Sequence, residues 1–294
     1  YLEKKTTRQE QPAIFARDVK YTGISKSGKE INENDLPHVL AEWQQFEETG
    51  KLFLKGKKAI KNKSSDELFL IDPTEVTDRI DVAYHVPSYR RMIKTLDEMI
   101  GAGTHEVKRI GDFVVADRVE PSDLENNVYR YIDIGTIDAE RCEIIASEIT
   151  EDFLGELPDR ARFQVKENDV IFPLSYDSLG KVAIIPKELD GALASTGFVV
   201  IRNKTFDDAV LLWSIIRSKV MQKQFHHIAS GYTQRAVSAQ HLGELRFPFP
   251  KSGKDTLIAS IRESLVAASD SRQDELKAIK AITGFTAASI GVDS

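Results

Sequence analysis

Apolar residues recur every three or four positions in several parts of the chain, and this spacing predicts amphipathic helices. The first predicted helix follows Asp35, which is placed to cap it, and carries Pro37 in its first turn. The second begins at Pro87 and ends at Gly101, and the third spans residues 206–228. Their apolar faces contain, in order, Val39, Leu40, Trp43 and Phe46; Tyr89, Met92, Ile93, Leu96 and Ile100; and Val210, Leu211, Trp213, Ile215, Ile216, Val220 and Phe225.

A fourth helical pattern occupies residues 254–282, which contain no proline. Ile258, Ile261, Leu265, Ile279 and Ile282 lie close to a spacing of three to four. This stripe is typical of a helix that packs along another helix. We predict that its partner is the helix at residues 88–100 or a second copy of the chain. The small, polar tail after it is expected to fray.

Short apolar runs between turn residues predict strands in the middle of the chain. A short helix near residues 239–242 is expected before a further strand at 245–249, and the prolines of Phe247–Pro250 are expected to break regular structure. Mixed helices and strands without a regular alternation indicate an α+β fold. The six central strands are predicted at residues 129–136, 141–146, 160–165, 169–174, 181–186 and 197–202.

Composition adds limits on function. The 294 residues are 41% hydrophobic and 29% charged, which is ordinary for a soluble globular protein. A net charge of -6 gives no overall basic surface, so any DNA contact must come from a local patch or be shared with a partner. The single cysteine, Cys142, fits a reducing cytosol, and no apolar run approaches the ~18 residues of a membrane helix. We therefore expect a cytoplasmic protein without membrane contact.

Common catalytic and metal-binding patterns do not fit this sequence. Gly23–Lys29 is close to a phosphate-binding loop, but Glu30 stands where that loop needs a hydroxyl for magnesium, so a turn is predicted. The six histidines lack zinc-ligand spacing, and His226 and His227 end the long helix, where a positive charge suits the helix dipole. Neither a metal site nor an independent enzyme is predicted.

Residues Lys51–Ser65 include six lysines interrupted by small residues. Two interpretations remain open for them: a solvated, mobile connector, or a strip that faces phosphates.

The polar loop Ser230–Arg235 offers the best candidate contacts with DNA. Gln234 can bond to adenine and Arg235 to guanine in the major groove, while the hydroxyls of Tyr232 and Thr233 suit phosphate oxygens. Arg235 can also hold a phosphate. The alternative is a polar turn that only docks the long helix on the sheet.

A second hydroxyl-rich turn, Ser175–Lys181, lies between two predicted strands. Tyr176, Ser178 and Lys181 are its candidate DNA contacts, with Lys181 placed to neutralise a phosphate. The alternative is an ordinary solvated turn.

Six short segments in a fixed order resemble the target recognition domain of type I restriction–modification specificity subunits. The resemblance covers roughly residues 107–250, and a long helix follows in that family as it does here. The glutamine usual after the last segment is replaced by Lys251–Asp255. The segments are Tyr131–Ile137, Glu167–Phe172, Gly180–Pro186, Ala194–Phe198, Ala229–Arg235 and Leu245–Pro250.

The N-terminal residues resemble the closing segment of adenine-specific DNA methyltransferases of the modification-subunit kind. The resemblance rests on Phe15–Gly23, Ser27–Lys29 and Asn34–Pro37. It implies the C-terminal portion of a methyltransferase–specificity fusion, which the start at Tyr1 rather than Met also suggests. The catalytic Asn-Pro-Pro-aromatic motif and a glycine-rich S-adenosylmethionine loop are absent, so the fragment needs no cofactor of its own. S-adenosylmethionine is expected for the parent or partner enzyme.

Together these resemblances imply sequence-specific recognition of double-stranded DNA for an adenine methyltransferase. The expected partners are DNA, a methyltransferase domain or subunit, and a second recognition unit held by the C-terminal helix. The alternative is a scaffold that binds only protein subunits. The expected parts are a methyltransferase tail (1–55), a linker (56–80), a recognition domain (81–250) and a spacer helix with its tail (251–294).

Overall fold

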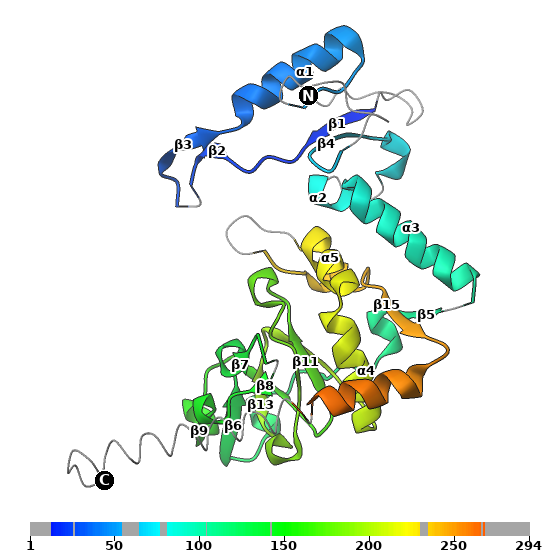
Figure 1. Ribbon diagram of the computed structural model, residues 1–294. Helices are drawn as coiled ribbons and strands as arrows, with labels where there is room; N and C mark the ends of the chain where they lie inside the picture. The colour runs from blue at the N-terminus through cyan, green and yellow to red at the C-terminus, as the bar shows by residue number, and fades with distance from the viewer. Residues whose placement is uncertain are drawn as a thin grey trace, which may run out of the picture.

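A computed structural model describes residues 13–25, 27–54, 65–76, 81–103, 105–141, 143–229, 235–265 and 267. A small N-terminal part and a larger part with two main sheets are joined through one helix, α3 (Figure 1). Helices and strands are mixed without a regular alternation. The predicted α+β class is therefore confirmed.

The N-terminal part contains two antiparallel strand pairs and one helix. β1 (Ile14–Arg17) pairs with β4 (Leu68–Ile71), and β2 (Thr22–Ile24) pairs with β3 (Glu30–Asn34). Helix α1 (Leu36–Thr49) follows β3 directly. The β2–β3 hairpin occupies the near match to a phosphate-binding loop, so the predicted turn is confirmed.

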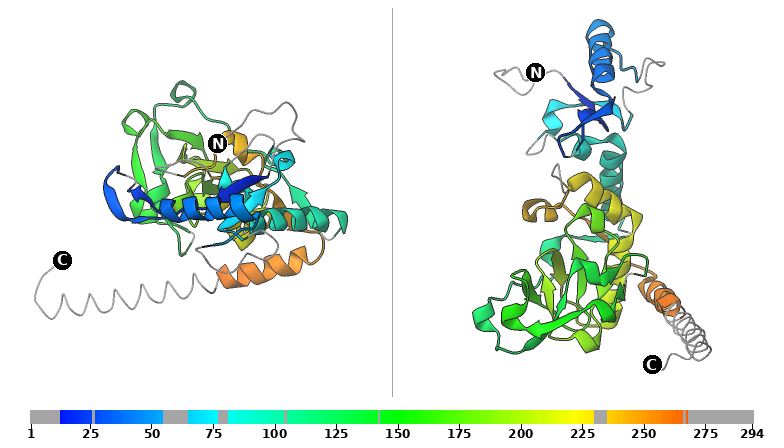
Figure 2. Two further views of the ribbon diagram at one scale, coloured as in Figure 1. Left: turned by 90° about the horizontal axis from the view of Figure 1, so that it is seen from above. Right: turned by 90° about the vertical axis from the view of Figure 1, so that its left-hand side faces the viewer.

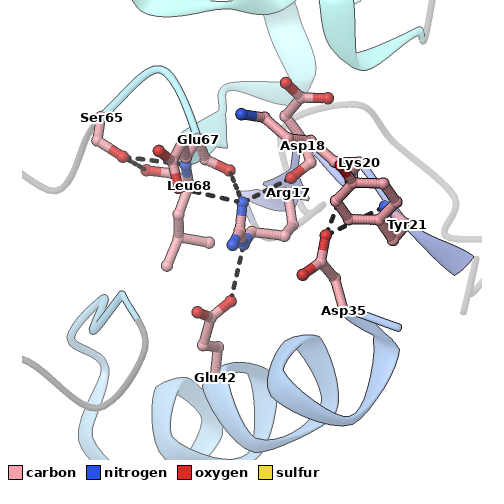
Figure 3. Close-up of polar contacts among 9 residues, drawn as sticks. All are labelled: Arg17, Asp18, Lys20, Tyr21, Asp35, Glu42, Ser65, Glu67 and Leu68. Carbon is pink, nitrogen blue, oxygen red and sulfur yellow. Dashed lines mark hydrogen bonds and ion pairs between the residues drawn. The ribbon is translucent and has the colours of Figure 1, made fainter. Parts of the chain in front are cut away.

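Aromatic packing and one buried ion pair fasten α1 to β1. The ring centroid of Phe15 lies 5.3 Å from that of Trp43 and 5.7 Å from that of Phe46. The Nε atom of Arg17 lies 2.9 Å from the carboxylate of Glu42, and their side chains are only 6% and 3% exposed (Figure 3). Removing either charge would leave the other buried without its main partner.

Two details of α1 differ from the prediction. The carboxylate of Asp35 does not cap the helix; it accepts hydrogen bonds from the backbone N–H groups of Lys20 (3.2 Å) and Tyr21 (3.1 Å). Leu40 is 57% exposed although it was predicted on the apolar face, because β1 covers only the side of α1 that carries Trp43.

Helix α3 links the two parts (Figure 2). A short helix, α2 (Val82–His85), precedes α3 (Pro87–Gly101), which begins and ends where the sequence predicts. Tyr89, Ile93 and Leu96 are buried as expected, whereas Ile100 near the helix end is 45% exposed. The predicted stripe is therefore right over its first three turns.

The larger part is organised around a three-stranded antiparallel sheet. β11 (Val170–Pro173) lies between β12 (Ala183–Ile184) and β14 (Phe198–Ile201), and every residue of β11 and β14 is buried. Alternate side chains enter two separate cores, so Val170 and Phe172 pack on the helix side and Ile171 packs on the other. A sheet buried on both faces requires such continuous apolar runs.

A four-stranded sheet supplies the second layer, in the order β10–β13–β6–β9, and β13 and β6 are parallel. The six predicted central strands all correspond to observed strands, each shorter than predicted. Strands β5, β7, β9 and β13, each of two to four residues, were not predicted separately. The remaining bounds are β5 (His105–Lys108), β6 (Val128–Ile132), β7 (Ile137–Asp138), β8 (Glu143–Ile144), β9 (Thr150–Phe153), β10 (Ala161–Gln164) and β13 (Leu193–Ser195).

The predicted long helix is two helices, α4 (Phe206–Arg217) and α5 (Lys219–Ile228). The break lies at Ser218, whose ψ of 152° is extended and whose hydroxyl accepts a hydrogen bond from the N–H of Met221 (3.3 Å). Apolar spacing alone does not reveal this cap, because the pattern continues through it.

Beyond α5, the short helix α6 (Ala239–Leu242) is confirmed, and the strand after it is β15 (Phe247–Pro250). The prediction that its prolines break regular structure was wrong. β15 pairs antiparallel with β5 in a two-stranded sheet. Proline is tolerated in an edge strand because the residue that lacks an N–H can lie on the side that faces away from the paired strand.

Residues 254–265 are helical, as is residue 267, and the rest of the predicted helix lies outside the described residues. Ile258 is 6% exposed, and Ile261 and Leu265 pack on the same core. The contacts are with α4 rather than α3: Arg262 lies 2.8 Å from Asp207. Lys254 lies 3.5 Å from Asp208, also on α4. The acidic first turn of α4 attracts these two cations, while the apolar stripe packs on the core.

The lysine-rich segment is described only at its ends. Leu52 is 1% exposed, so the start of the segment is fixed to the N-terminal part. Residues 55–64, and with them most of the predicted connector, lie outside the described residues. Strand β4 lies within the predicted linker 56–80 and pairs with β1.

Replacing Glu42 by alanine should lower the local unfolding free energy of the N-terminal part by roughly 3 kcal/mol, at the low end of the range for breaking a buried pair. The reason is that Arg17 stays buried and, among the described residues, keeps one carboxylate near it, that of Glu67 at 3.7 Å, besides the backbone carbonyls of Asp18 and Glu67. Native-state amide exchange on β1 and β4 measures this. Glu47→Gln, an exposed change on the same helix, is the control and should stay within about 0.5 kcal/mol. Equal exchange in the two variants would contradict the prediction.

Candidate functional site

The two polar loops singled out in the sequence meet in the folded chain. The N–H of Tyr176 donates to the carbonyl of Arg235 (2.9 Å), and Ser175 forms an antiparallel bridge with Ala236. The N–H of Val237 donates to the carbonyl of Leu174 (2.9 Å). A short backbone ladder therefore fastens the end of the second loop to the start of the first.

The guanidinium of Arg235 is occupied within the protein. It donates to the backbone carbonyls of His226 and Ala229, the latter at 3.3 Å. Both carbonyls belong to the end of α5, where unpaired carbonyls and the helix dipole favour a cation. The same guanidinium lies 4.9 Å from the ring centroid of Tyr176. Arg235 thus contacts both loops and α5 at once.

Tyr176 also meets His226, with 5.2 Å between ring centroids. Burial lowers the pKa of His226, and the charge of Arg235 lowers it further, while Asp18 opposes both effects. The neutral imidazole is therefore favoured at this position. The sequence had suggested a positive charge here to suit the helix dipole, but Arg235 takes that place instead.

The other two candidates of the first loop lie in a tight turn. Ser178 ends the 3-10 turn Tyr176–Ser178, and its carbonyl accepts a hydrogen bond from the N–H of Lys181 (2.8 Å). The ammonium of Lys181 donates to the carbonyl of Ile134 (3.0 Å) in a partly buried contact. In this structure Lys181 thus ties the turn to the segment Tyr131–Ile137.

Three sequence-predicted site residues, Tyr232, Thr233 and Gln234, lie outside the described residues. The loop that contains them begins after Ala229 and ends at Arg235. The structure thus brings Tyr176 and Arg235 together and holds both ends of this loop.

A cavity of about 620 Å³ lies beside the end of α5. It is lined by the basic or imidazole side chains of Lys223, His226 and Arg235. Three aspartates, Asp18, Asp66 and Asp81, also line it. Sequence reasoning did not single out Lys223 or the three aspartates, since they are far apart along the chain. Side chains of both charge signs therefore line this cavity.

His227 fixes the position of α5 against α2 and α3. Its Nδ1 lies 2.7 Å from the carbonyl of Ala83, and its ring stacks on Tyr89 with 4.6 Å between centroids. Burial lowers the pKa of His227 most strongly, which favours a neutral ring that donates to Ala83. The bond to Ala83 and the charge of Asp66 oppose this shift, while His226 and Lys223 add to it.

A second cavity, of about 610 Å³, lies away from these loops. Its walls are mainly apolar and include Phe206, Trp213 and Leu265. Among the described residues there is no group of three or more side chains suited to a metal ion. Within the same residues, no helix has the length and apolar character needed to cross a membrane.

Comparisons with known proteins agree with the predicted resemblance. Residues 102–281, more than half of the chain, match the family model of the type I restriction modification DNA specificity domain. No curated protein gives a significant match.

Two solved structures are similar in part. The HsdS subunit from Thermoanaerobacter tengcongensis is 24% identical over 64% of this chain and 47% of its own, with a TM-score of 0.46. A chain from a structure that addresses complex assembly and conformational transition of the type I R-M system is 27% identical over 61% of this chain and 45% of its own, with a TM-score of 0.47. This chain therefore matches about half the length of each.

Stability should fall as the pH drops below about 6.5, where an unfolded histidine starts to bind a proton. Because the folded pKa of His227 is lowered, the unfolded state takes up the proton first and is favoured. His227→Asn keeps a donor for Ala83 but does not titrate. Between pH 7 and pH 5 the original chain should lose more stability in urea unfolding than this variant does. If both proteins lost the same free energy of unfolding between pH 7 and pH 5, His227 would not be the source of the pH dependence.

Proposed function

This chain belongs to the family of type I restriction–modification DNA specificity domains, and on that premise we propose that it reads a short double-stranded DNA sequence through the loops 175–181 and 230–235. The observation that supports this proposal is the backbone ladder between Tyr176 and Arg235, which bonds the start of the first loop to the end of the second. A rigid support is what base reading needs, because side chains must be aimed at base edges.

Within this surface we assign base reading to Gln234 and Arg235 and phosphate contact to Tyr176, Ser178, Lys181, Tyr232 and Thr233. Gln and Arg side chains match adenine and guanine edges in the major groove, while hydroxyl and ammonium groups suit phosphates. Lys181 would first have to release the carbonyl of Ile134, which a phosphate can replace as acceptor.

The partner we propose is an adenine-specific methyltransferase domain or subunit, which holds S-adenosylmethionine and flips the target base. The N-terminal part, with β1, β4 and α1, is proposed as the closing segment of such an enzyme. Its independent packing around Arg17 and Glu42 supports a separate unit. Since its substrate would be cellular DNA, the proposed location is the cytoplasm.

The helix at residues 254–265 is proposed as the start of a spacer that sets the distance to a second recognition unit. Its ion pairs with Asp207 and Asp208 give it a fixed base on α4. A spacer must be anchored in this way, because a helix can hold a second unit at a defined distance and orientation only when its own first end is fixed.

A scaffold without DNA contact is the second candidate. The observation that favours it is the presence of Asp18, Asp66 and Asp81 in the cavity beside Arg235. Carboxylates repel phosphates, so DNA would have to approach from the loop side rather than through this cavity.

The deciding experiment selects bound sequences from a random duplex library with the full chain, alone and with its methyltransferase partner, at two salt concentrations. Replacing Gln234 by alanine should weaken the preferred site by about 1–3 kcal/mol and leave non-specific binding nearly unchanged. Gln222→Ala, an exposed glutamine on α5, is the matched control. If the original chain enriches no sequence in either setting, the scaffold candidate replaces this proposal.

A further inference from the structure

The loop 175–181 leaves β11 at an end of the two sheets where a third segment of the chain also lies. Ser195, at the end of β13, is the partner of Ala161 at the start of β10. Phe198, at the start of β14, is the partner of Pro173 at the end of β11. Strand β6 runs parallel to β13 and ends beside it. The turn after β6 and the residue before β10 therefore lie at the same end of the sheets as this loop.

The turn after β6 binds two cations through adjacent residues. The carboxylate of Asp133 lies 2.7 Å from the guanidinium of Arg160, and the carbonyl of Ile134 accepts a hydrogen bond from the ammonium of Lys181 (3.0 Å). The turn is itself fixed, because Oδ1 of Asp133 accepts from the N–H of Ile134 (2.7 Å). The carbonyl of Asp133 also accepts from the hydroxyl of Thr136 (2.8 Å), which is buried. Arg160 is thus tied to the same turn as a residue of the proposed DNA surface.

The guanidinium of Arg160 keeps most of its five N–H groups open to a ligand. Its side chain is 56% exposed, and Asp133 is its side-chain partner among the described residues. The backbone of Arg160 is held as well, because its carbonyl accepts a hydrogen bond from the N–H of Thr196 (2.8 Å). A guanidinium that is fixed at one edge and open at the other can form the paired hydrogen bonds that guanine accepts in the major groove.

The carboxylate beside Arg160 favours a base over a phosphate as its ligand. Asp133 compensates the charge of the guanidinium and would repel a phosphate placed next to it. The O6 and N7 atoms of guanine are uncharged acceptors, so they meet no such repulsion. An exposed ion pair adds little to stability, whereas a fixed orientation is what base reading requires.

We infer that Arg160 is a further base-reading residue, directed at guanine, and that Asp133 is its positioning residue. This inference rests on the proposed function and deepens it, since it adds a third segment to the DNA surface and names one base. Lys181, bound to the neighbouring carbonyl, keeps its proposed role on a phosphate.

Arg160→Ala tests the reading role by selection from a random duplex library, with the full chain and its methyltransferase partner. Preference should fall about 10-fold or more at one G·C pair and stay unchanged at other positions, because one side chain reads one base. The salt dependence of non-specific binding should keep its slope, because no phosphate contact is removed. Amide exchange of Thr196, which bonds to the backbone carbonyl of residue 160, checks that the fold is intact.

Asp133→Asn tests the positioning role. This variant keeps an oxygen for the N–H of Ile134 but removes the charge that holds Arg160. Preference should relax at the same G·C pair, and the double variant should add little to Arg160→Ala. If Asp133 only supports the fold, Asp133→Asn lowers the urea midpoint and leaves the preference of the folded protein unchanged, which would overturn this part of the inference.

Arg130→Ala is the matched control. Arg130 lies on β6, is 46% exposed and has a carboxylate 3.9 Å away, that of Glu151, but it lines the apolar cavity away from the loops. Its removal should leave sequence preference unchanged. An equal relaxation in Arg130→Ala and Arg160→Ala would contradict a reading role for Arg160.

The remaining outcomes separate this inference from the proposed function. If the original chain selects a sequence and Arg160→Ala selects it equally well, the inference fails and the proposed function stands. A uniform loss on all sequences with a lower salt slope would make Arg160 a phosphate contact and also overturn the inference. If the original chain selects no sequence, the proposed function fails and the inference fails with it.

Discussion

The burial of β11 and β14 on both faces is the constraint on which the larger part depends. Each strand must place alternate side chains into two different cores, so neither face tolerates a polar residue. Helices α4 and α5 cover one face, and the sheet that contains β6 and β13 lies on the other. The loop at residues 175–181 leaves directly from the end of β11 and therefore starts from a rigid element.

The end of α5 is where three parts of the chain come together. His227 packs on Tyr89 and bonds to Ala83, which fixes α5 against α2 and α3. One residue earlier, His226 gives its carbonyl to Arg235 and its ring to Tyr176. Adjacent residues of one helical turn thus hold the connecting helices on one side and the candidate DNA surface on the other.

Polar interactions at this junction are made mostly with backbone carbonyls rather than with carboxylates. Arg235, Lys181 and His227 all bond to main-chain oxygens, of Ala229, Ile134 and Ala83 respectively. Such contacts fix the geometry of these side chains. Asp18, Asp66 and Asp81 line the same cavity as Arg235, so cations and anions meet beside the end of α5.

Local spacing in the sequence was enough for the α+β class and for most helices and central strands, and the resemblance of six ordered segments indicated the family. Apolar periodicity reports which face of an element is buried, and buried faces such as Val170–Pro173 are continuous along the chain. Tertiary structure alone decided the break at Ser218, the short strand Leu193–Ser195 and the choice of α4 as partner of the last helix. It also decided that Arg235 contacts Tyr176 and that Glu42 is buried. The physical reason is that a polar side chain takes its role from the acceptors brought to it by distant segments, which its sequence neighbours do not specify.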